Sequence, residues 1–447
     1  MKSRRLLTIV SLLLVFCLTL GGCACEHVWQ EANCQGPRTC TLCGATEGNV
    51  GTHSYAVTET APDCTAPGYQ VHTCTVCGHE EKTQIADPLD HVSLGGRCIT
   101  CGEVLDDDTK NLILIIGDGM GKNHITAGEL MSGETYEIRS WDCVSVDTDS
   151  IKANGEETLT DSAASATALA TGTLTINGYV GKDSNGEDLQ TILDYAKSLG
   201  KKTGVLTTDY IYGATPSGFS AHAMNRNDTA DILNSQLTCN VDLLLAAQSD
   251  AANAMQAEIE QNGYTFCQTL SSARNNLTKD KLYCAFEMEG YSNSSQAVTL
   301  AEAASLAVDY LENENGFVLV IEQAHIDKYS HNNKFSELVS MVKSFAATVD
   351  VVSEWADQRA DTAILITSDH ETGGLYVSQT IPYENLAISD QYENVYYKFS
   401  STDHTRAEVW LFLKGADVDF ETLPTYRYGH IIKNIDVNTL MKSLLEE

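Results

Sequence analysis

Hydrophobic and polar positions beyond residue 110 alternate between two patterns. Continuous apolar runs bounded by polar residues predict buried strands, and they cover residues 111–117, 203–208, 317–321, 362–367 and 409–413. Apolar residues at helical spacing precede three of these runs, at residues 189–199, 300–311 and 335–355. The alternation predicts an α/β fold in which a largely parallel central sheet carries helices on both faces.

The start of the chain has the pattern of an export signal. A basic stretch, MKSRR, precedes a mostly apolar run over residues 6–20 that is short for a membrane span. The following Leu20-Gly21-Gly22-Cys23 resembles a bacterial lipobox. We therefore expect residues 1–22 to be a signal peptide, Cys23 to carry a lipid anchor, and the protein to be a cell-surface lipoprotein on the outer face of the bacterial membrane. An ordinary secretory signal is the alternative.

Histidines and cysteines repeat between residues 23 and 109. Three CxxCG knuckles begin at Cys40, Cys74 and Cys98. Because tetrahedral zinc takes four sulfur or nitrogen ligands and a CxxC turn supplies two, the repeats predict zinc-ribbon-like sites in a Cys-rich spacer. The candidate structural ligands are Cys34, Cys40, Cys43, His53, Cys64, Cys74, Cys77, His91, Cys98 and Cys101.

The spacing of these ligands allows more than one grouping. One grouping joins Cys34, Cys40 and Cys43 with His53, joins Cys64, Cys74 and Cys77 with His91, and leaves Cys98 and Cys101 to recruit Cys25, His27 or His79. The opposite grouping joins each histidine with the cysteines after it. Disulfides are the alternative to zinc in an oxidising compartment. The division predicted for the whole chain is residues 1–22, 23–109 and 110–447.

The composition restricts the partners of the protein. Asp and Glu number 61 against 28 Lys and Arg, and the formal net charge is -33. Such an excess of negative charge argues against binding to a nucleic-acid backbone. The hydrophobic content of 43% is that of an ordinary folded protein. Phosphate chemistry on this chain would have to rely on local positive charge.

Ligand-type side chains follow three of the predicted strands. Asp118 comes after the first run, Glu322, Asp327 and His331 follow residues 317–321, and Asp369 with His370 follows residues 362–367. Sites in parallel sheets gather where the strands end. Carboxylates and imidazoles from separate segments suit a cluster of divalent cations, and zinc accepts both kinds of ligand.

The stretch TDSAASATALATG, residues 160–172, predicts a closely packed helix with Ser162 at its amino end. Unpaired backbone N–H groups at such an end attract anions. A serine is a weak nucleophile and needs a base or a metal to activate it. This serine lacks the GxSxG elbow of hydrolases, so the sequence favours activation by a metal at the strand ends.

Six stretches in the same order give residues 110–447 a resemblance to the alkaline phosphatase family. They are NLILIIGDGMG (111–121), TDSAASATALATG (160–172), ATPSGFSAHAMNR (214–226), IEQAHIDKYSH (321–331), TSDHETGG (367–374) and STDHT (401–405). The resemblance implies an alkaline phosphatase-like fold and hydrolysis of phosphate monoesters through a phosphoserine. It also suggests a homodimer and a broad choice of small-molecule substrates.

The resemblance also implies a role for each matching residue. Ser162 would be the nucleophile, Asp118, Asp369 and His370 would hold the zinc that activates it, and Asp327, His331 and His404 would hold a second zinc. Asp118 would also reach a magnesium shared with Thr215 and Glu322. Arg226 would bind the phosphate, and Lys328 would support it through water. His222 and His325 are expected to serve packing.

One position departs from the family pattern. Gly213 stands where the family usually has Asp or His, so it offers no side chain to the magnesium site. Residues 231–293 carry no recognisable motif. A Cys267–Cys284 disulfide is one possibility in this segment, and the sequence leaves the pairing of Cys143 and Cys239 open. Two other functions remain open: a phosphodiesterase or related phosphate-transfer enzyme, and a non-catalytic zinc-binding surface lipoprotein.

Overall fold

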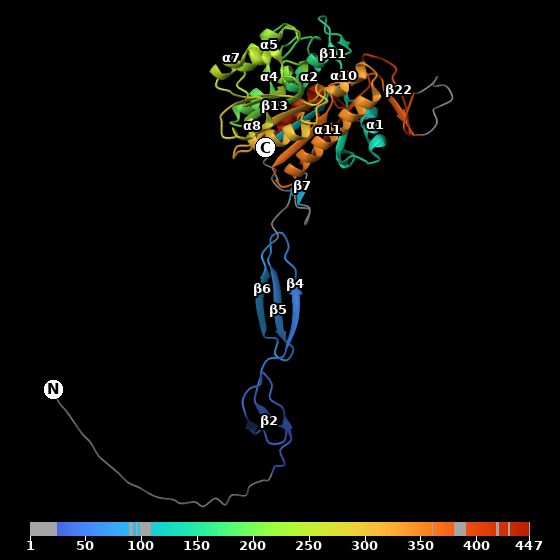
Figure 1. Cartoon of the computed structure of the whole chain (residues 1–447). Coiled ribbons are helices and arrows are strands. Elements are labelled where there is room, and N and C mark those ends of the chain that lie inside the picture. Colours follow the sequence, from blue (N-terminus) through green and yellow to red (C-terminus); the bar gives the residue numbers. More distant parts are fainter. Residues whose placement is uncertain are drawn as a thin grey trace, which may run out of the picture. The chain divides into compact units, whose positions relative to one another are not determined.

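A computed structural model of the chain describes residues 25–88, 93–94, 97–98, 109–359, 361–379, 390–416, 420–427 and 430–446 (Figure 1). The chain divides into two compact units, Met1–His91 and Val92–Glu447. The predicted signal peptide and Cys23 lie outside the described residues. Within the described part, no helix is both long and apolar enough to cross a bilayer.

The larger unit is built on one ten-stranded sheet. Its strands are, in spatial order, β15 (Thr265–Cys267), β16 (Leu282–Phe286), β14 (Leu243–Ala247), β13 (Lys202–Tyr210), β17 (Phe317–Gln323), β9 (Asn111–Gly117), β18 (Thr362–Thr367), β24 (Val409–Lys414), β10 (Asp142–Asp147) and β25 (Ile431–Lys433). Neighbours from β15 to β18 are all parallel, whereas β24 is antiparallel to both of its neighbours. The predicted largely parallel sheet is therefore confirmed.

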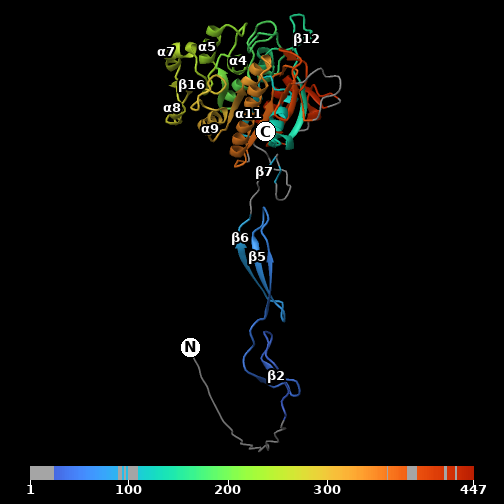
Figure 2. The same ribbon diagram turned by 45° about the vertical axis from the view of Figure 1, so that its right-hand side comes forward.

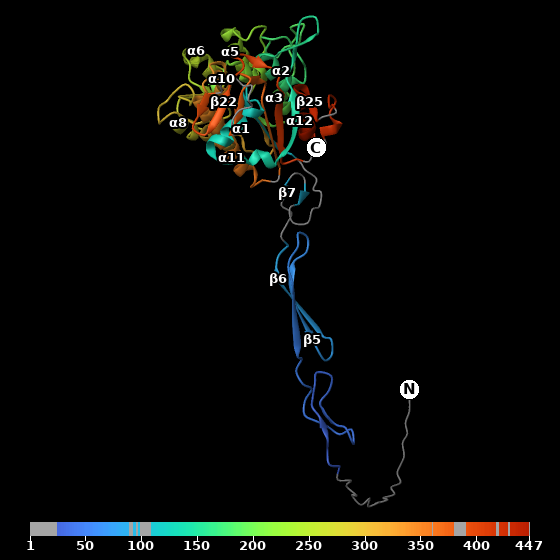
Figure 3. The same ribbon diagram turned by 90° about the vertical axis from the view of Figure 1, so that its right-hand side faces the viewer.

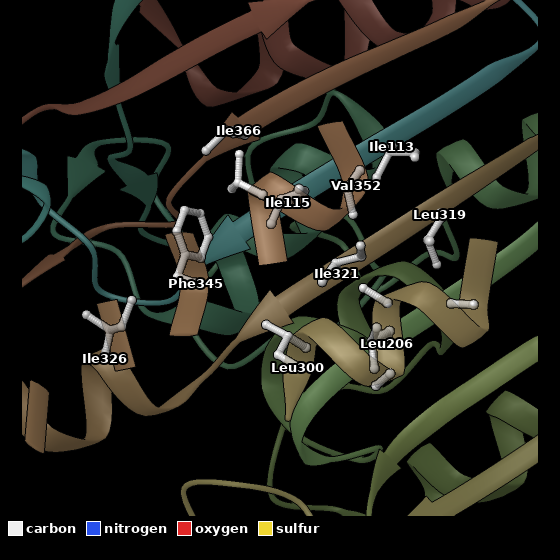
Figure 4. Packing of buried hydrophobic residues seen from close by; sticks show 14 of the residues in the cluster. Ile113, Ile115, Leu206, Leu300, Leu319, Ile321, Ile326, Phe345, Val352 and Ile366 are labelled. Carbon is white, nitrogen blue, oxygen red and sulfur yellow. The ribbon is translucent and has the colours of Figure 1, made fainter. Parts of the chain in front are cut away.

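Alternate side chains of the central strands pack into two separate cores, one on each face of the sheet. Ile113 and Ile115 of β9 join the core formed with Leu206, Phe345 and other residues, whereas Leu112 and Leu114 join the core on the opposite face. Figure 4 shows Ile113, Ile115 and Phe345 in the first core. Because the side chains of a strand alternate between its faces, a wholly apolar strand must be covered on both sides.

Helices supply that cover (Figures 2 and 3). The first core includes residues of α9 (Leu300–Leu311), α10 (His325–His331) and α11 (Phe335–Ala356), and the second includes residues of α2 (Ser162–Thr171), α3 (Ile192–Ser198) and α12 (Asn434–Glu446). The other helices are α1 (Lys122–Ser132), α4 (Ala214–Ser220), α5 (Thr229–Thr238), α6 (Asp250–Ala254), α7 (Gln256–Gln261) and α8 (Leu270–Arg274).

Several predicted elements have the observed boundaries. The strand over residues 111–117, the strand over 362–367 and the helix over 300–311 begin and end where the sequence places them. Residues 231–293, which carry no motif, supply most of α5, all of α6 to α8 and the sheet strands β14, β15 and β16. The three strands are short, and they are held by parallel pairing at one end of the sheet.

The smaller unit contains two three-stranded antiparallel sheets. One is formed by β1 (Trp29–Gln30), β2 (Arg38–Cys40) and β3 (Thr46–Glu47), and the other by β4 (Tyr55–Thr60), β5 (Gly68–Cys74) and β6 (Glu80–Ala86). In the two CxxCG knuckles that begin at Cys40 and Cys74, the chain makes a tight turn in which the glycine N–H donates to the carbonyl of the first cysteine. Gly44 and Gly78 have φ of 71° and 73°, a conformation that favours glycine.

The knuckles form two clusters of metal-type ligands. The Cys25 cluster consists of Cys25, His27, Cys40 and Cys43, and the Cys34 cluster consists of Cys34, His53, Cys74 and Cys77. Both groupings allowed by spacing are therefore wrong in part, because Cys34 lies with the second knuckle and Cys25 lies with the first. The predicted roles of His91, Cys98 and Cys101 concern side chains outside the described part of the chain.

Candidate active site

The residues expected at the strand ends meet at one edge of the larger sheet. Strands β17, β9 and β18 are adjacent and parallel, so their carboxyl ends lie together. Asp118 follows β9, Glu322 lies at the end of β17, and Asp369 with His370 follows β18. All four side chains are buried. The edge is therefore a concentrated set of carboxylates with an imidazole among them.

Ser162 is the first residue of α2, as the sequence predicts. The Asp161 side chain caps this helix by accepting a hydrogen bond from the Ala164 N–H at 2.9 Å. Every residue of α2 is buried, and a Cβ added at Gly218 of α4 would lie 2.7 Å from Ala166. The small side chains therefore let α4 pack closely on α2. Because α2 is buried on all sides, its sequence has no amphipathic pattern.

The serine hydroxyl faces the ligand-type residues. Its Oγ lies 3.2 Å from Nε2 of His370. The same nitrogen lies 3.2 Å from Oδ2 of Asp369 and 3.7 Å from Oδ1 of Asp118. Asp118, Asp369 and His370, here called the Asp118 group, place one ligand atom each within 4.8 Å of one another.

A second set of ligand atoms lies beside the first. Asp327, His370 and His404, here called the Asp327 group, also lie within 4.8 Å of one another, and the His370 and His404 rings stack at 3.5 Å between centroids. His331 contacts Asp327 at 3.3 Å from the next turn of α10. The structure thus brings together the six ligands predicted for the two zinc ions of the active site, with His370 common to both groups.

The three histidines present the same nitrogen to the site. Nδ1 of His331 lies 2.6 Å from the Thr402 carbonyl, Nδ1 of His404 lies 2.9 Å from the Thr160 carbonyl, and Nδ1 of His370 lies 3.1 Å from the Thr372 hydroxyl. Each bond fixes a ring and leaves Nε2 for the cluster. Metal-binding histidines in proteins are held by hydrogen bonds of this kind.

Buried polar atoms without a hydrogen-bond partner mark the same place. Oδ1 of Asp118, Oδ2 of Asp369 and Oγ1 of Thr215 are buried and have no hydrogen-bond partner among the residues that the structure describes. A buried carboxylate oxygen without a partner is costly. A bound cation would satisfy these atoms, so the donor set fits the metals expected from the sequence.

The carboxylates repel one another in the absence of cations. Burial, together with the carboxylates of Asp369, Asp327 and Glu322, raises the pKa of Asp118 well above its usual value. Burial and the Asp209 carboxylate raise the pKa of Glu322 to about 8. Burial also favours a higher pKa for Asp369, but the neighbouring His370 outweighs burial and lowers the pKa of Asp369 to about 2. Positive charge is needed for all of these groups to ionise together.

Arg226 is held at the start of the serine helix. Its Nη1 donates to Oδ2 of Asp161 at 3.1 Å, and the Gly178 N–H donates to the same oxygen at 3.0 Å. Asp161 therefore caps α2 with one oxygen and holds Arg226 with the other. The guanidinium is therefore held by the residue that directly precedes Ser162. The Arg226 side chain is 33% exposed.

Asp209 and Tyr291 were missed by sequence reasoning. Lys328 Nζ contacts Oδ1 of Asp209 at 2.5 Å and donates to the Tyr291 hydroxyl at 2.7 Å, and that hydroxyl also donates to Asp209. A Cβ added at Gly213 would lie 2.8 Å from Oδ2 of Asp209. Asp209 thus fills the space beside the glycine. The only signal in the sequence was an acid near the end of a predicted strand.

Other predictions have mixed outcomes. Nε2 of His222 lies 2.9 Å from the Leu189 carbonyl, and His325 is buried with Nδ1 3.1 Å from the Thr208 hydroxyl, so both serve packing as expected. Cys267 and Cys284 are paired in register on β15 and β16, but they are free thiols. The suggested disulfide between them is therefore wrong.

The fold and the site together define an α/β protein in which the serine that begins a buried helix faces clustered metal-type ligands. The family model described as alkaline phosphatase matches residues 109–243 and 274–411. The chain belongs to the alkaline phosphatase family.

Curated relatives support this assignment. The chain is 30% identical to alkaline phosphatase 4 of Bacillus subtilis over 292 residues, which are 60% of this chain and 63% of that protein. It is 25% identical to the alkaline phosphatase of Escherichia coli over 335 residues, which are 59% of this chain and 70% of that enzyme. The chain thus spans less than two thirds of the Bacillus relative.

Solved structures share the fold. The cold-active alkaline phosphatase of Shewanella sp. superposes with a TM-score of 0.66 and 24% identity, covering 75% of this chain and 100% of that one. A variant of the alkaline phosphatase of the Antarctic bacterium TAB5, solved with bound Mg, gives a TM-score of 0.63 at 23% identity, covering 76% and 99%.

Proposed function

We propose that this protein hydrolyses phosphate monoesters to an alcohol and inorganic phosphate, with Ser162 as the nucleophile. The observation that carries the proposal is the position of the serine Oγ, 3.2 Å from His370 and beside the buried Asp118 and Asp369. A serine in such a place can be activated by a cation that replaces its proton. The family membership of the chain supports the same reaction.

The site fits two zinc ions and one magnesium. Asp118, Asp369 and His370 would hold one zinc, and Asp327, His331 and His404 would hold the other, each histidine through Nε2. The unpartnered Oγ1 of Thr215 and the buried Glu322 would complete a magnesium site with Asp118. When bound, such ions supply fixed positive charge for the attacking and leaving oxygens and lower the pKa of a water.

The residues of this chain would act in two displacements. Ser162 loses its proton, Oγ attacks phosphorus in line, the bond to the substrate oxygen breaks, and that oxygen takes up a proton from solvent as the alcohol leaves. Water then loses a proton and attacks the phosphoserine from the vacated side, the bond to Oγ breaks, Oγ regains a proton, and phosphate leaves. Catalysis of this kind is largely positioning and electrostatic stabilisation.

Two cationic side chains would orient the phosphoryl group. Arg226, held by Asp161 through Nη1 alone, can offer a two-pronged contact to the non-bridging oxygens. Lys328 is held by Asp209 and Tyr291, and we infer that it reaches phosphate through water. Asp209 is in our proposal a positioning residue: it makes the contact with Lys328 that Gly213, which has no side chain, does not supply.

The location of the protein belongs to the same proposal. We propose that it acts outside the cytoplasm as a lipoprotein anchored through Cys23, with the repeats of residues 23–109 as a spacer. Its relatives in Bacillus and Escherichia are alkaline phosphatases, and small phosphate monoesters would be its substrates. A homodimer is also proposed.

The test compares a monoester with a diester on the purified full chain supplied with zinc and magnesium. We expect rapid release of 4-nitrophenol from 4-nitrophenyl phosphate and slow release from bis(4-nitrophenyl) phosphate. Faster turnover of the diester would favour the phosphodiesterase alternative, and no turnover of either would favour a non-catalytic lipoprotein.

Ser162→Ala assigns the reaction to the serine. This change should lower kcat by about a thousandfold or more and abolish the phosphoryl group that acid quenching traps on the wild-type protein. Ser220→Ala is the matched control, because Ser220 is a buried serine of the adjacent helix α4 that donates to the Pro216 carbonyl. An unchanged rate in Ser162→Ala would place the nucleophile elsewhere.

A further inference from the structure

The smaller unit has almost no hydrophobic core. Among its described residues, the buried apolar side chains are Cys40, Cys64 and Cys74. Strand β4 is exposed except at its first residue, and β6 is exposed except at its last. Small sheets of this size need a covalent or metal staple, because burial alone cannot offset the entropy of ordering the chain. What holds the unit together must therefore be found at the cysteines.

The cysteines gather with histidines in two equivalent places. Sγ of Cys43 lies 3.3 Å from Nδ1 of His27, and Sγ of Cys77 lies 3.3 Å from Nδ1 of His53. Sγ of Cys34 lies 3.5 Å from Sγ of Cys74. In each cluster, the four ligand atoms lie within 4.8 Å of one another.

These separations match the corners of a zinc tetrahedron. Zn–S and Zn–N bonds of about 2.3 and 2.1 Å place the ligand atoms about 3.5 to 3.8 Å apart. A disulfide would need sulfurs at about 2.05 Å, and the cysteines of both clusters are free thiols. Three sulfurs also leave one thiol over after any disulfide, and a disulfide gives the imidazole no role.

The backbone builds the same cradle twice. The N–H of Thr41 donates to the Val28 carbonyl at 2.9 Å, and the N–H of Thr75 donates to the Ser54 carbonyl at 2.9 Å. Val28 follows His27 directly and Ser54 follows His53, so each bond fixes a knuckle beside its histidine. A repeated backbone arrangement around four ligand atoms indicates a built site.

We propose that the Cys25 cluster and the Cys34 cluster each bind one structural zinc ion, and that their ligands interleave along the chain. Cys34 lies between His27 and Cys40 of the Cys25 cluster in the sequence, yet it belongs to the cluster of the next knuckle. The second zinc therefore fastens the first sheet to the second. Four protein ligands close each site, as in structural rather than catalytic zinc centres.

Cobalt tests the sites independently of catalysis. In the full chain loaded with Co²⁺ in place of zinc, the clusters should give a sulfur-to-cobalt charge-transfer band in the near ultraviolet. The Asp118 and Asp327 groups contain only oxygen and nitrogen ligands, so they cannot contribute to this band. Absence of the band, with a mass showing that the cysteines have lost hydrogen as disulfides, would overturn the proposal and leave the proposed hydrolysis untouched.

Paired variants test the interleaving. Cys34→Ser and Cys77→Ser should each lower the intensity of the band by the same amount, and each should lower the bound zinc by about one ion per chain. The variant that combines Cys34→Ser with Cys77→Ser should lose no more zinc than either single variant. Cys34→Ser combined with Cys43→Ser should lose both ions. The reverse result, with Cys34 and Cys43 behaving as one site, would refute the interleaved ligand set. Cys143→Ser, which changes an exposed cysteine of the larger unit, is the control and should keep both ions.

Discussion

Gly213→Asp is the substitution that tests how Asp209 fits the site. Gly213 has φ of -58° and ψ of 160°, so any residue can adopt its backbone conformation. The difficulty is space, because a Cβ here would lie 2.8 Å from Oδ2 of Asp209 and 3.0 Å from the Tyr210 carbonyl. A carboxylate introduced here would also stand beside the carboxylate of Asp209.

The size of the effect follows from these two terms. Overpacking of a close-packed position costs about 1–3 kcal/mol. Two like charges about 4 Å apart repel by about 4 kcal/mol at an effective dielectric constant near 20. Gly213→Ala should show the first cost alone. Gly213→Asp should show both, about 5–7 kcal/mol in all, which is a large part of the stability of an ordinary domain.

A compensating change should recover most of this loss. In Asp209→Ala combined with Gly213→Asp, the new carboxylate takes over the space and the Lys328 contact that Asp209 has in the wild type. The free energy of unfolding in urea, measured at fixed zinc and magnesium concentrations, should therefore show coupling of several kcal/mol between the two positions. If Gly213→Asp unfolds at the wild-type urea concentration, or if the double variant is no more stable than Gly213→Asp, the reasoning is wrong.

Three further predictions concern phosphate binding, metals and the core. Arg226→Lys keeps the charge but loses the two-pronged contact, so kcat/KM for 4-nitrophenyl phosphate should fall by about 10- to 100-fold; an unchanged value would exclude Arg226 from the phosphate site. Chelation with EDTA should abolish hydrolysis, zinc with magnesium should restore it, and recovery with magnesium alone would contradict the proposed zinc ligands. Phe345→Ala should lower the free energy of unfolding by about 3–5 kcal/mol because Phe345 is 2% exposed in the core of Figure 4, while Lys343→Ala on the same helix should cost little.

Much of the site could be read from local patterns. Wholly apolar runs such as residues 111–117 and 362–367 have to be buried strands, and the polar residue after each strand then lies at the sheet edge. A run of small residues opened by Thr160 and Asp161 predicts a capped helix with Ser162 at its start, as observed. These inferences succeed because each depends on neighbours in the sequence.

Contacts between distant segments could not be read in this way. His370 is shared by the Asp118 and Asp327 groups, and Asp209 reaches Lys328 from a strand more than a hundred residues away in the chain. Strands β14 and β16 are five-residue apolar runs, LLLAA and LYCAF, but nothing in these runs specifies which strands lie beside them. Which strand lies beside which depends on the packing of the whole sheet, and spacing along the chain carries little information about it.

The sequence by itself determined the strands, the helix with Ser162 at its start and the kinds of ligand present, since periodicity and residue chemistry are local properties. Only the tertiary structure decided which ligands meet. Cys34 shows the reason most clearly. It lies six residues before Cys40, but it sits in the turn between β1 and β2 with its Sγ 3.5 Å from that of Cys74, because side-chain direction is set by the backbone that surrounds a residue and not by its distance along the chain.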